Sequence, residues 1–168
     1  QICKLAGAKV IGLTGSAEKC AWLTDDLGFD VAINYKDADW YEQLEAAAPD
    51  RLDVIFDNVG GVILDRSLKL IAMRGVVLLC GSTSQYSQET MVGPNNYIWL
   101  GTMRASMQGF VVFDYADQYA QARARMAAWI KAGLLKTVSY EIAGDVDVFP
   151  QAFQALYLAG SWCSTSLG

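Results

Sequence analysis

Apolar and polar residues alternate along the chain in blocks that predict strands followed by helices. Short apolar runs that end in small or polar residues predict strands, and apolar residues three or four positions apart predict amphipathic helices. By these patterns, strands are expected at residues 9–13, 29–34, 53–57, 76–79, 107–113 and 137–142. Helices are expected at residues 1–6, 17–27, 38–47, 62–71, 95–104, 115–132 and 148–159. This alternation is typical of an α/β fold with a doubly wound parallel sheet.

The strand at 53–57 carries the clearest functional signal. Val54, Ile55 and Phe56 are apolar without polar alternation, which predicts a strand covered on both faces. The run stops at Asp57 and Asn58, and a glycine pair follows. Because ligands bind at the carboxyl ends of the strands in open α/β sheets, the polar side chains there are binding candidates. The local pattern leaves open whether Asn58 contacts a ligand or caps the next helix.

Composition excludes several classes of partner. A chain of 168 residues with 53% hydrophobic and 18% charged residues is typical of a globular domain. The net charge of -5 and the lack of a basic stripe argue against nucleic acid as a partner. No apolar stretch approaches the roughly 20 residues of a membrane span, and no leader pattern is visible at the start.

The cysteines and the absence of histidine limit the chemistry. The four cysteines show no C-x-x-C spacing, so we expect neither a metal site nor a disulfide framework. The chain has no histidine, which excludes Ser-His and Cys-His catalysis and His-ligated zinc within it. The sequence identifies no catalytic residue, and scattered thiols favour a cytoplasmic protein.

Small polar residues and a lysine follow the first two strands. Ser16 is placed to cap the helix at 17–27, and Lys19 lies in its first turn. No acidic residue holds the position typical of NAD-preferring sites, whereas a helix start with a lysine suits the 2′-phosphate of NADP. Tyr35 at the end of the second strand is expected beside Lys19. Taken alone, Lys19 is better interpreted as a solvated surface lysine, and only the expected position of Tyr35 beside it favours the phosphate site.

Five motifs together resemble one known family. They are Gly15-Ser16-Ala17-Glu18-Lys19, Asn34-Tyr35-Lys36, Phe56-Asp57-Asn58-Val59-Gly60-Gly61, Cys80-Gly81-Ser82 with Tyr86, and Gln108-Gly109-Phe110-Val111-Val112. Their order and spacing over about residues 1–160 resemble the cofactor domain of zinc-independent medium-chain dehydrogenases/reductases. Within that superfamily the motifs resemble the branch of NADP-dependent 2-alkenal, prostaglandin and curcumin reductases. The resemblance implies NADP(H) as cofactor.

The resemblance also implies a set of cofactor contacts. These are Ser16, Lys19, Tyr35, Asn58, Cys80, Gly81, Ser82, Tyr86, Phe110, Val111 and Val112. The first three belong to the 2′-phosphate site, the asparagine to the centre of the cofactor, and residues 80–82 to its pyrophosphate and nicotinamide side. The last three would line the nicotinamide, mainly through their backbone, or are simply core residues of a strand.

The chain departs from the family in three places. The GroES-like catalytic domain is absent, and so are the first strand and glycine-rich turn of the Rossmann-type cofactor domain. That strand would lie between the strands at 9–13 and 53–57, so a gap of roughly 9–10 Å is expected there. The tail at 161–168 does not match the family. We therefore expect a truncated NADP-binding domain at 1–160 that is inactive by itself.

The resemblance implies a reaction and a partner. Hydride from NADPH would reduce the C=C bond of an α,β-unsaturated aldehyde or ketone. The alternatives are a quinone oxidoreductase of the same superfamily, and a non-catalytic nucleotide-binding or dimerisation fragment. Family members dimerise through the last strand of this domain, which predicts a homodimer through Met107–Phe113.

Overall fold

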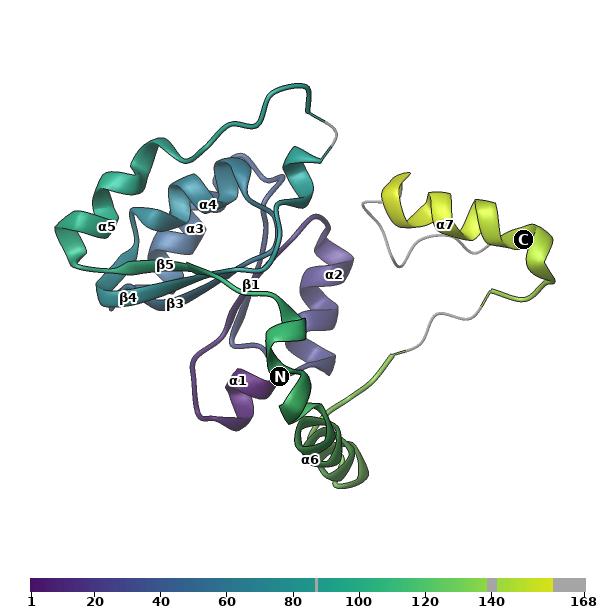
Figure 1. Cartoon of the computed structure of the whole chain (residues 1–168). Coiled ribbons are helices and arrows are strands. Elements are labelled where there is room, and N and C mark those ends of the chain that lie inside the picture. The colour runs from purple at the N-terminus through teal and green to yellow at the C-terminus, as the bar shows by residue number, and fades with distance from the viewer. Residues whose placement is uncertain (87, 139–141, 159–168) are drawn as a thin grey trace. The chain divides into compact units, whose positions relative to one another are not determined.

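The computed structural model describes residues 1–86, 88–138 and 142–158 (Figure 1). The chain forms two compact units: Gln1–Trp40 with Arg123–Gly168, called here the β1–β2 unit, and Tyr41–Ala122, called the β3–β5 unit. Strands and helices alternate and every strand pair is parallel, which confirms the predicted α/β class.

The β1–β2 unit holds a two-stranded parallel sheet. Strands β1 (Ile11–Thr14) and β2 (Val31–Asn34) pair in register from Ile11↔Val31 to Thr14↔Asn34. The short helix α1 (Ile2–Leu5) precedes β1. Helix α2 (Ala17–Ala21) lies between the strands in sequence and continues as one π-helical turn, Trp22–Asp26. A Cβ atom at Gly12 of β1 would lie 2.7 Å from Leu23 and 2.9 Å from Phe29, so glycine there allows close packing.

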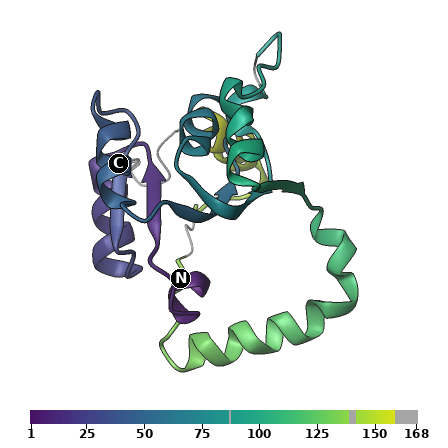
Figure 2. The same cartoon turned by 90° about the vertical axis from the view of Figure 1, so that its left-hand side faces the viewer.

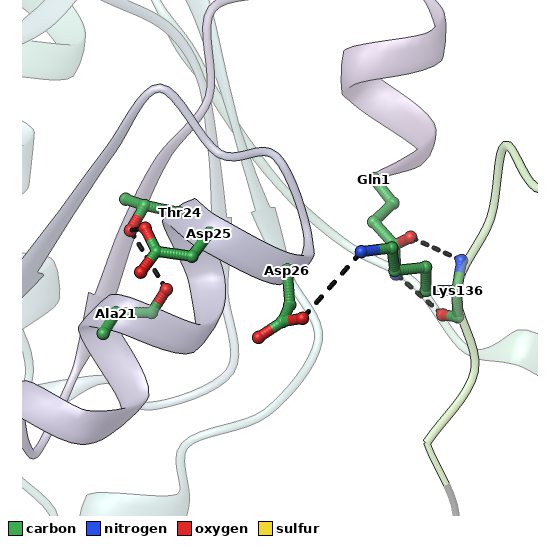
Figure 3. A network of polar contacts seen from close by, with 6 residues as sticks. All are labelled: Gln1, Ala21, Thr24, Asp25, Asp26 and Lys136. Carbon is green, nitrogen blue, oxygen red and sulfur yellow. Dashed lines mark hydrogen bonds and ion pairs between the residues drawn. The ribbon is translucent and has the colours of Figure 1, made fainter.

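The N-terminal residue is tied to the chain that follows α6 (Tyr119–Lys131) (Figure 3). The side-chain amide of Gln1 donates to the Lys136 carbonyl at 3.0 Å, and the Lys136 N–H donates to Gln1 Oε1 at 2.7 Å. Lys136 Nζ also lies 3.9 Å from Asp26 Oδ1. These contacts hold α1 and the segment after α6 together within one unit. Figure 2 shows α6 as one long continuous helix, and α7 (Phe149–Leu158) is the last helix described.

The β3–β5 unit is a three-stranded parallel sheet with helices on one face. Strands β3 (Leu52–Asp57), β4 (Ile71–Leu79) and β5 (Ser106–Gly109) lie in the order β3-β4-β5. Helices α3 (Trp40–Ala47), α4 (Gly61–Leu68) and α5 (Ile98–Met103) alternate with them along the chain (Figure 1). The core joins α4 and β4, and α5 packs against it; its buried members are Leu64, Leu68, Ile71 and Val77.

No ladder joins the two sheets among the strands that the structure describes, because β1 pairs only with β2 and β3 only with β4. The sequence predicted a missing strand at this point of the sheet order. The parallel pairing within each sheet is as predicted. Each sheet has fewer strands than a complete doubly wound sheet.

The prediction that β3 is covered on both faces was wrong. Val54 is 57% exposed and Phe56 is 62% exposed, whereas Asp57 is buried. Successive side chains of a strand point to opposite faces, so Val54 and Phe56 share one face. The core lies on the α4 side of the sheet, and the opposite face of β3 is open to solvent.

The strand expected at 107–113 ends at Gly109. Leu79 is the last residue of β4 and pairs with Gly109, so the residues beyond it have no strand to pair with. Val112–Gln118 instead forms a 3₁₀ segment that leads into α6. Arg74 and Gly75 fall between the helix predicted at 62–71 and the strand predicted at 76–79. In the structure they lie inside β4, where Arg74 has a φ of 61° and the register with β3 shifts. The strand expected at 137–142 falls partly outside the described residues.

Candidate nucleotide-binding site

Ser16 caps α2 as predicted. Its backbone is extended and its Oγ accepts a hydrogen bond from the Lys19 N–H at 3.3 Å. This bond satisfies one of the N–H groups that a helix start leaves without a partner. It also places Lys19 one turn into α2, on the segment that follows the carboxyl end of β1.

Tyr35 lies against Gly15 at the same end of the sheet. The Tyr35 N–H donates to the Thr14 carbonyl at 2.9 Å, which extends the β1–β2 alignment by one residue. A Cβ atom at residue 15 would lie 2.8 Å from the Tyr35 hydroxyl and 3.4 Å from Cε of Lys36. The structure therefore brings the phenol and the stem of Lys36 to the turn that Ser16 and Lys19 begin. The prediction that Tyr35 lies near this turn is consistent with that geometry.

A short polar turn follows β2. Asn34 Nδ2 donates to Asp37 Oδ1 at 2.7 Å, and Asn34 Oδ1 accepts from the Lys36 N–H at 3.2 Å. Burial raises the pKa of the Cys20 thiol, and the negative charge of Asp37 raises it further. Cys20 on α2 is therefore held as the neutral thiol.

A second set of candidates lies in the β3–β5 unit, where Asp57 anchors the turn after β3. Its carboxylate is 4% exposed and accepts from the Val59 N–H at 3.2 Å and from the Gly60 N–H at 3.0 and 3.1 Å. Gly60, with a φ of 70°, is the N-cap residue of α4, and no side chain caps that helix. The alternative that Asn58 caps the helix was therefore wrong, because Asp57 holds the turn from inside.

The turn after β4 is hydrogen-bonded to the turn after β3. The Asp57 carbonyl accepts from the N–H groups of Cys80 and Gly81 at 2.8 and 3.3 Å. The Asn58 carbonyl accepts from the Thr83 N–H at 3.1 Å. Strand ends that are neighbours in a parallel sheet thus present their loops as one connected surface.

Four predicted residues meet on this surface. A Cβ atom at Gly81 would lie 2.7 Å from Asn58 Oδ1 and 3.1 Å from the Tyr86 hydroxyl, so only glycine leaves room for both groups. The Ser82 N–H donates to the Tyr86 hydroxyl at 3.4 Å. The side-chain amide and the phenol are neutral donors and acceptors, suited to hydrogen-bonding a ligand without a charge. Cys80 is exposed at the same turn.

The structure places the remaining candidates differently from the prediction. Phe110, Val111 and Val112 follow the end of β5, so they are not the core strand residues of the alternative interpretation. Val111 and Val112 are 54% and 56% exposed. The ring of Phe110 lies 6.1 Å from that of Phe56, centroid to centroid. Phe110 therefore lies beside the exposed apolar face of β3.

Sequence reasoning missed the roles of Asp57, Lys36 and Ser84. An Asp three residues before a glycine at a helix start is a signal for the turn that Asp57 makes. Lys36 directly follows Tyr35 in the sequence, and this adjacency could have indicated that Lys36 lies near the same turn. Ser84 Oγ donates to the Val59 carbonyl at 2.6 Å, and a serine in a polar loop gives no such signal in the sequence.

The described part of the chain offers neither a metal site nor a membrane-spanning helix. No group of three His, Cys, Asp or Glu side chains is close enough to hold a metal ion among those residues. Within the same residues, no helix combines the length and apolar character needed to cross a membrane.

A family model described as "Zinc-binding dehydrogenase" matches residues 1–129. The chain belongs to this family. The assignment confirms the predicted resemblance to medium-chain dehydrogenases/reductases, the superfamily to which the zinc-binding dehydrogenases belong.

Several curated proteins and solved structures are similar to nearly the whole chain. The protein YfmJ of Bacillus subtilis is 40% identical over 163 residues, which cover 94% of this chain and 47% of YfmJ. The NADP(+)-dependent 2-alkenal reductase of Nicotiana tabacum is 37% identical over 158 residues, covering 94% and 46% of the two chains. The crystal structure of CurA from Vibrio vulnificus in complex with NADPH has a TM-score of 0.85 and 36% identity, covering 93% and 48%. The chain spans about half the length of the curated relatives that it matches.

Proposed function

We propose that the chain is the cofactor-binding part of an NADPH-dependent oxidoreductase that reduces the C=C bond of α,β-unsaturated aldehydes and ketones. The observation that carries the proposal is the similarity of 93% of the chain to a solved structure that contains NADPH. The name of the tobacco relative supports an alkenal as the class of substrate, and that of an Escherichia coli relative, 34% identical, supports curcumin.

The residues of the β1–β2 unit fit the 2′-phosphate end of NADP(H). Lys19 supplies a positive charge, and the hydroxyls of Ser16 and Tyr35 are neutral hydrogen-bonding groups at the same turn. Gly15 keeps the turn free of a side chain beside the Tyr35 hydroxyl. In the proposed site Lys19 and Tyr35 hold the phosphate, with Ser16 beside them.

The connected turns of the β3–β5 unit fit the uncharged middle of the cofactor. Asn58 and Tyr86 offer an amide and a phenol on either side of Gly81, and the backbone of Cys80 and Ser82 continues the same surface. Hydride transfer to the alkene is the chemistry that the nicotinamide supplies when the cofactor is bound. Phe110, Val111 and Val112 would give an apolar contact to its ring. In the proposed site these residues bind and orient the cofactor, and none of them is assigned as the proton donor.

Comparing NADPH with NADH tests the proposal on this chain. Wild type should bind NADPH more tightly than NADH in a calorimetric titration. Lys19→Ala should weaken NADPH by about tenfold, the loss of one partly exposed charged contact, and leave NADH nearly unchanged. Lys131→Ala, which removes an exposed lysine at the end of α6, is the matched control. Equal weakening of both nucleotides by Lys19→Ala would remove this lysine from the phosphate site.

A quinone oxidoreductase is the second candidate, because the enzyme of that name from Pseudomonas syringae is 27% identical with a TM-score of 0.72. Oxidation of NADPH by a quinone but not by an enone, in a full-length protein that contains this chain, would favour it. If this chain bound neither NADPH nor NADH, the alternative of a non-catalytic dimerisation fragment would be favoured. A cytoplasmic location, homodimerisation through Met107–Phe113, and lack of turnover by the isolated chain are further parts of the proposal.

A further inference from the structure

Ser84 bonds twice to one carbonyl group of the neighbouring turn. Its Oγ donates to the Val59 carbonyl at 2.6 Å and its backbone N–H donates to the same oxygen at 3.0 Å. A Cβ atom at Gly61 would lie 2.8 Å from the Ser84 Oγ, and Gly61 has a φ of 59°. The hydroxyl therefore fills the space that a side chain at residue 61 would need.

Val59 is also held from its other side. Its N–H donates to Asp57 Oδ1 at 3.2 Å, so Asp57 fixes one end of this residue and Ser84 the other. Asn58 lies between Asp57 and Val59 in the chain, and its own carbonyl accepts from the Thr83 N–H at 3.1 Å. With the backbone fixed on both sides, the Asn58 side chain is directed to the position beside Gly81.

We propose that Ser84 is a positioning residue of the cofactor site, which acts through the Val59 carbonyl to fix where Asn58 meets the cofactor. The inference rests on the proposed function. It adds a role for a residue that does not itself contact the ligand. Ser84 is exposed, so removing its hydroxyl leaves no cavity in the core. The substitution removes the bond to the Val59 carbonyl and the 3.3 Å bond that Oγ accepts from the neighbouring Gln85 Nε2.

The experiment compares two ligands on the full 168-residue chain. NADPH would engage the turns after β3 and β4, whereas adenosine 2′,5′-bisphosphate carries only the phosphate end assigned to Lys19 and Tyr35. Ser84→Ala should weaken NADPH by about fivefold, the size expected for one net hydrogen bond, and leave the bisphosphate affinity unchanged. Ser84→Thr keeps a hydroxyl and should restore NADPH binding.

Thr83→Ala is the matched control, because it removes a hydroxyl from the residue next to Ser84. Thr83 bonds to the turn after β3 through its backbone N–H, which the substitution keeps. NADPH affinity that is the same in Ser84→Ala and Thr83→Ala would overturn the inference and leave the proposed function standing. Equal loss of both ligands in Ser84→Ala would also overturn it, since that pattern indicates a general structural role. A wild-type chain that binds neither ligand would overturn the proposed function and the inference with it.

Discussion

A Cβ atom at residue 15 would lie 2.8 Å from the Tyr35 hydroxyl oxygen, so these two residues approach closely only because residue 15 is glycine. Gly15 is not among the glycines with positive φ. The requirement at this position is therefore space, and an alanine could adopt the same backbone. The contact joins the turn after β1 to the end of β2, where the proposed 2′-phosphate site lies.

Gly15→Ala should displace Tyr35 and weaken NADPH binding. The contact under 3 Å is relieved by a shift of the Tyr35 side chain, which moves its hydroxyl away from the proposed phosphate site. We expect a loss of about tenfold in affinity, the size of one hydrogen bond to a charged group. Titration calorimetry with NADPH measures it. Gly101→Ala is the control, because a Cβ there meets nothing within 4 Å. Unchanged NADPH affinity in Gly15→Ala would contradict a role for Tyr35 in this site.

The ion pair of Lys4 with Asp30 should make the stability of the β1–β2 unit depend on pH. Lys4 Nζ lies 2.7 Å from Asp30 Oδ1, and the Val10 N–H donates to Asp30 Oδ2 at 2.6 Å. The hydrogen bond from Lys4, then the one from Val10, lowers the pKa of Asp30. A carboxyl whose pKa is lower in the folded chain stabilises the fold above its unfolded pKa of about 3.9 and loses that contribution as the pH falls through the folded value.

Asp30→Asn should accordingly lower the midpoint of urea unfolding at pH 7 and have a smaller effect at pH 3, because the stabilisation by Asp30 decreases as the pH falls below its unfolded pKa. Asp117→Asn, at an exposed aspartate in the segment before α6, is the control. A difference between wild type and Asp30→Asn that stays constant from pH 7 to pH 3 would show that the charge of Asp30 adds nothing.

Asp57→Ala should destabilise the β3–β5 unit. The buried carboxylate is the acceptor for the N–H groups of Val59 and Gly60, and its loss leaves buried donors without a partner at a cost of about 1–3 kcal/mol. Asp57→Asn keeps an oxygen that can accept from both groups and should cost less. Denaturant unfolding of the two variants measures the difference. Equal stability of Asp57→Ala and wild type would mean that water replaces the carboxylate.

Local signals predicted the helix starts and stops well. Ser16 caps α2, and Gly28 and Gly133 have the positive φ expected of residues that end helices. These features depend on residues close in sequence. The ends of the strands predicted at 29–34, 53–57 and 76–79 were also placed correctly, because short apolar runs followed by small polar residues specify them locally.

Features that depend on distant segments could not be predicted in the same way. The strand at 107–113 is cut at Gly109 because β4 turns away after Leu79. The sequence placed both Asp57 and Asn58 at the end of the strand and assigned a cofactor contact to Asn58, but it gave no role to Asp57. Burial separates the two: the Asp57 carboxylate points inward and holds the turn, and the Asn58 amide stays exposed. Burial of Val54 and Phe56 requires a cover on their face of β3, which no local pattern reveals.

The open face and edge of β3 should make the isolated chain self-associate. Among the described strands β3 pairs with β4 alone, and Val54 and Phe56 are more than half exposed beside it. An exposed apolar edge strand is a template for pairing with another chain, and a charge on it opposes that pairing. Wild type should form concentration-dependent oligomers larger than a dimer in sedimentation velocity, and Phe56→Lys should reduce them to the dimer proposed through Met107–Phe113 without loss of helical circular dichroism. Val62→Lys places the same charge at an apolar residue of α4 that is 61% exposed. If Val62→Lys disperses the oligomers as well as Phe56→Lys does, the added net charge causes the dispersal, and pairing at the β3 edge does not explain the oligomers.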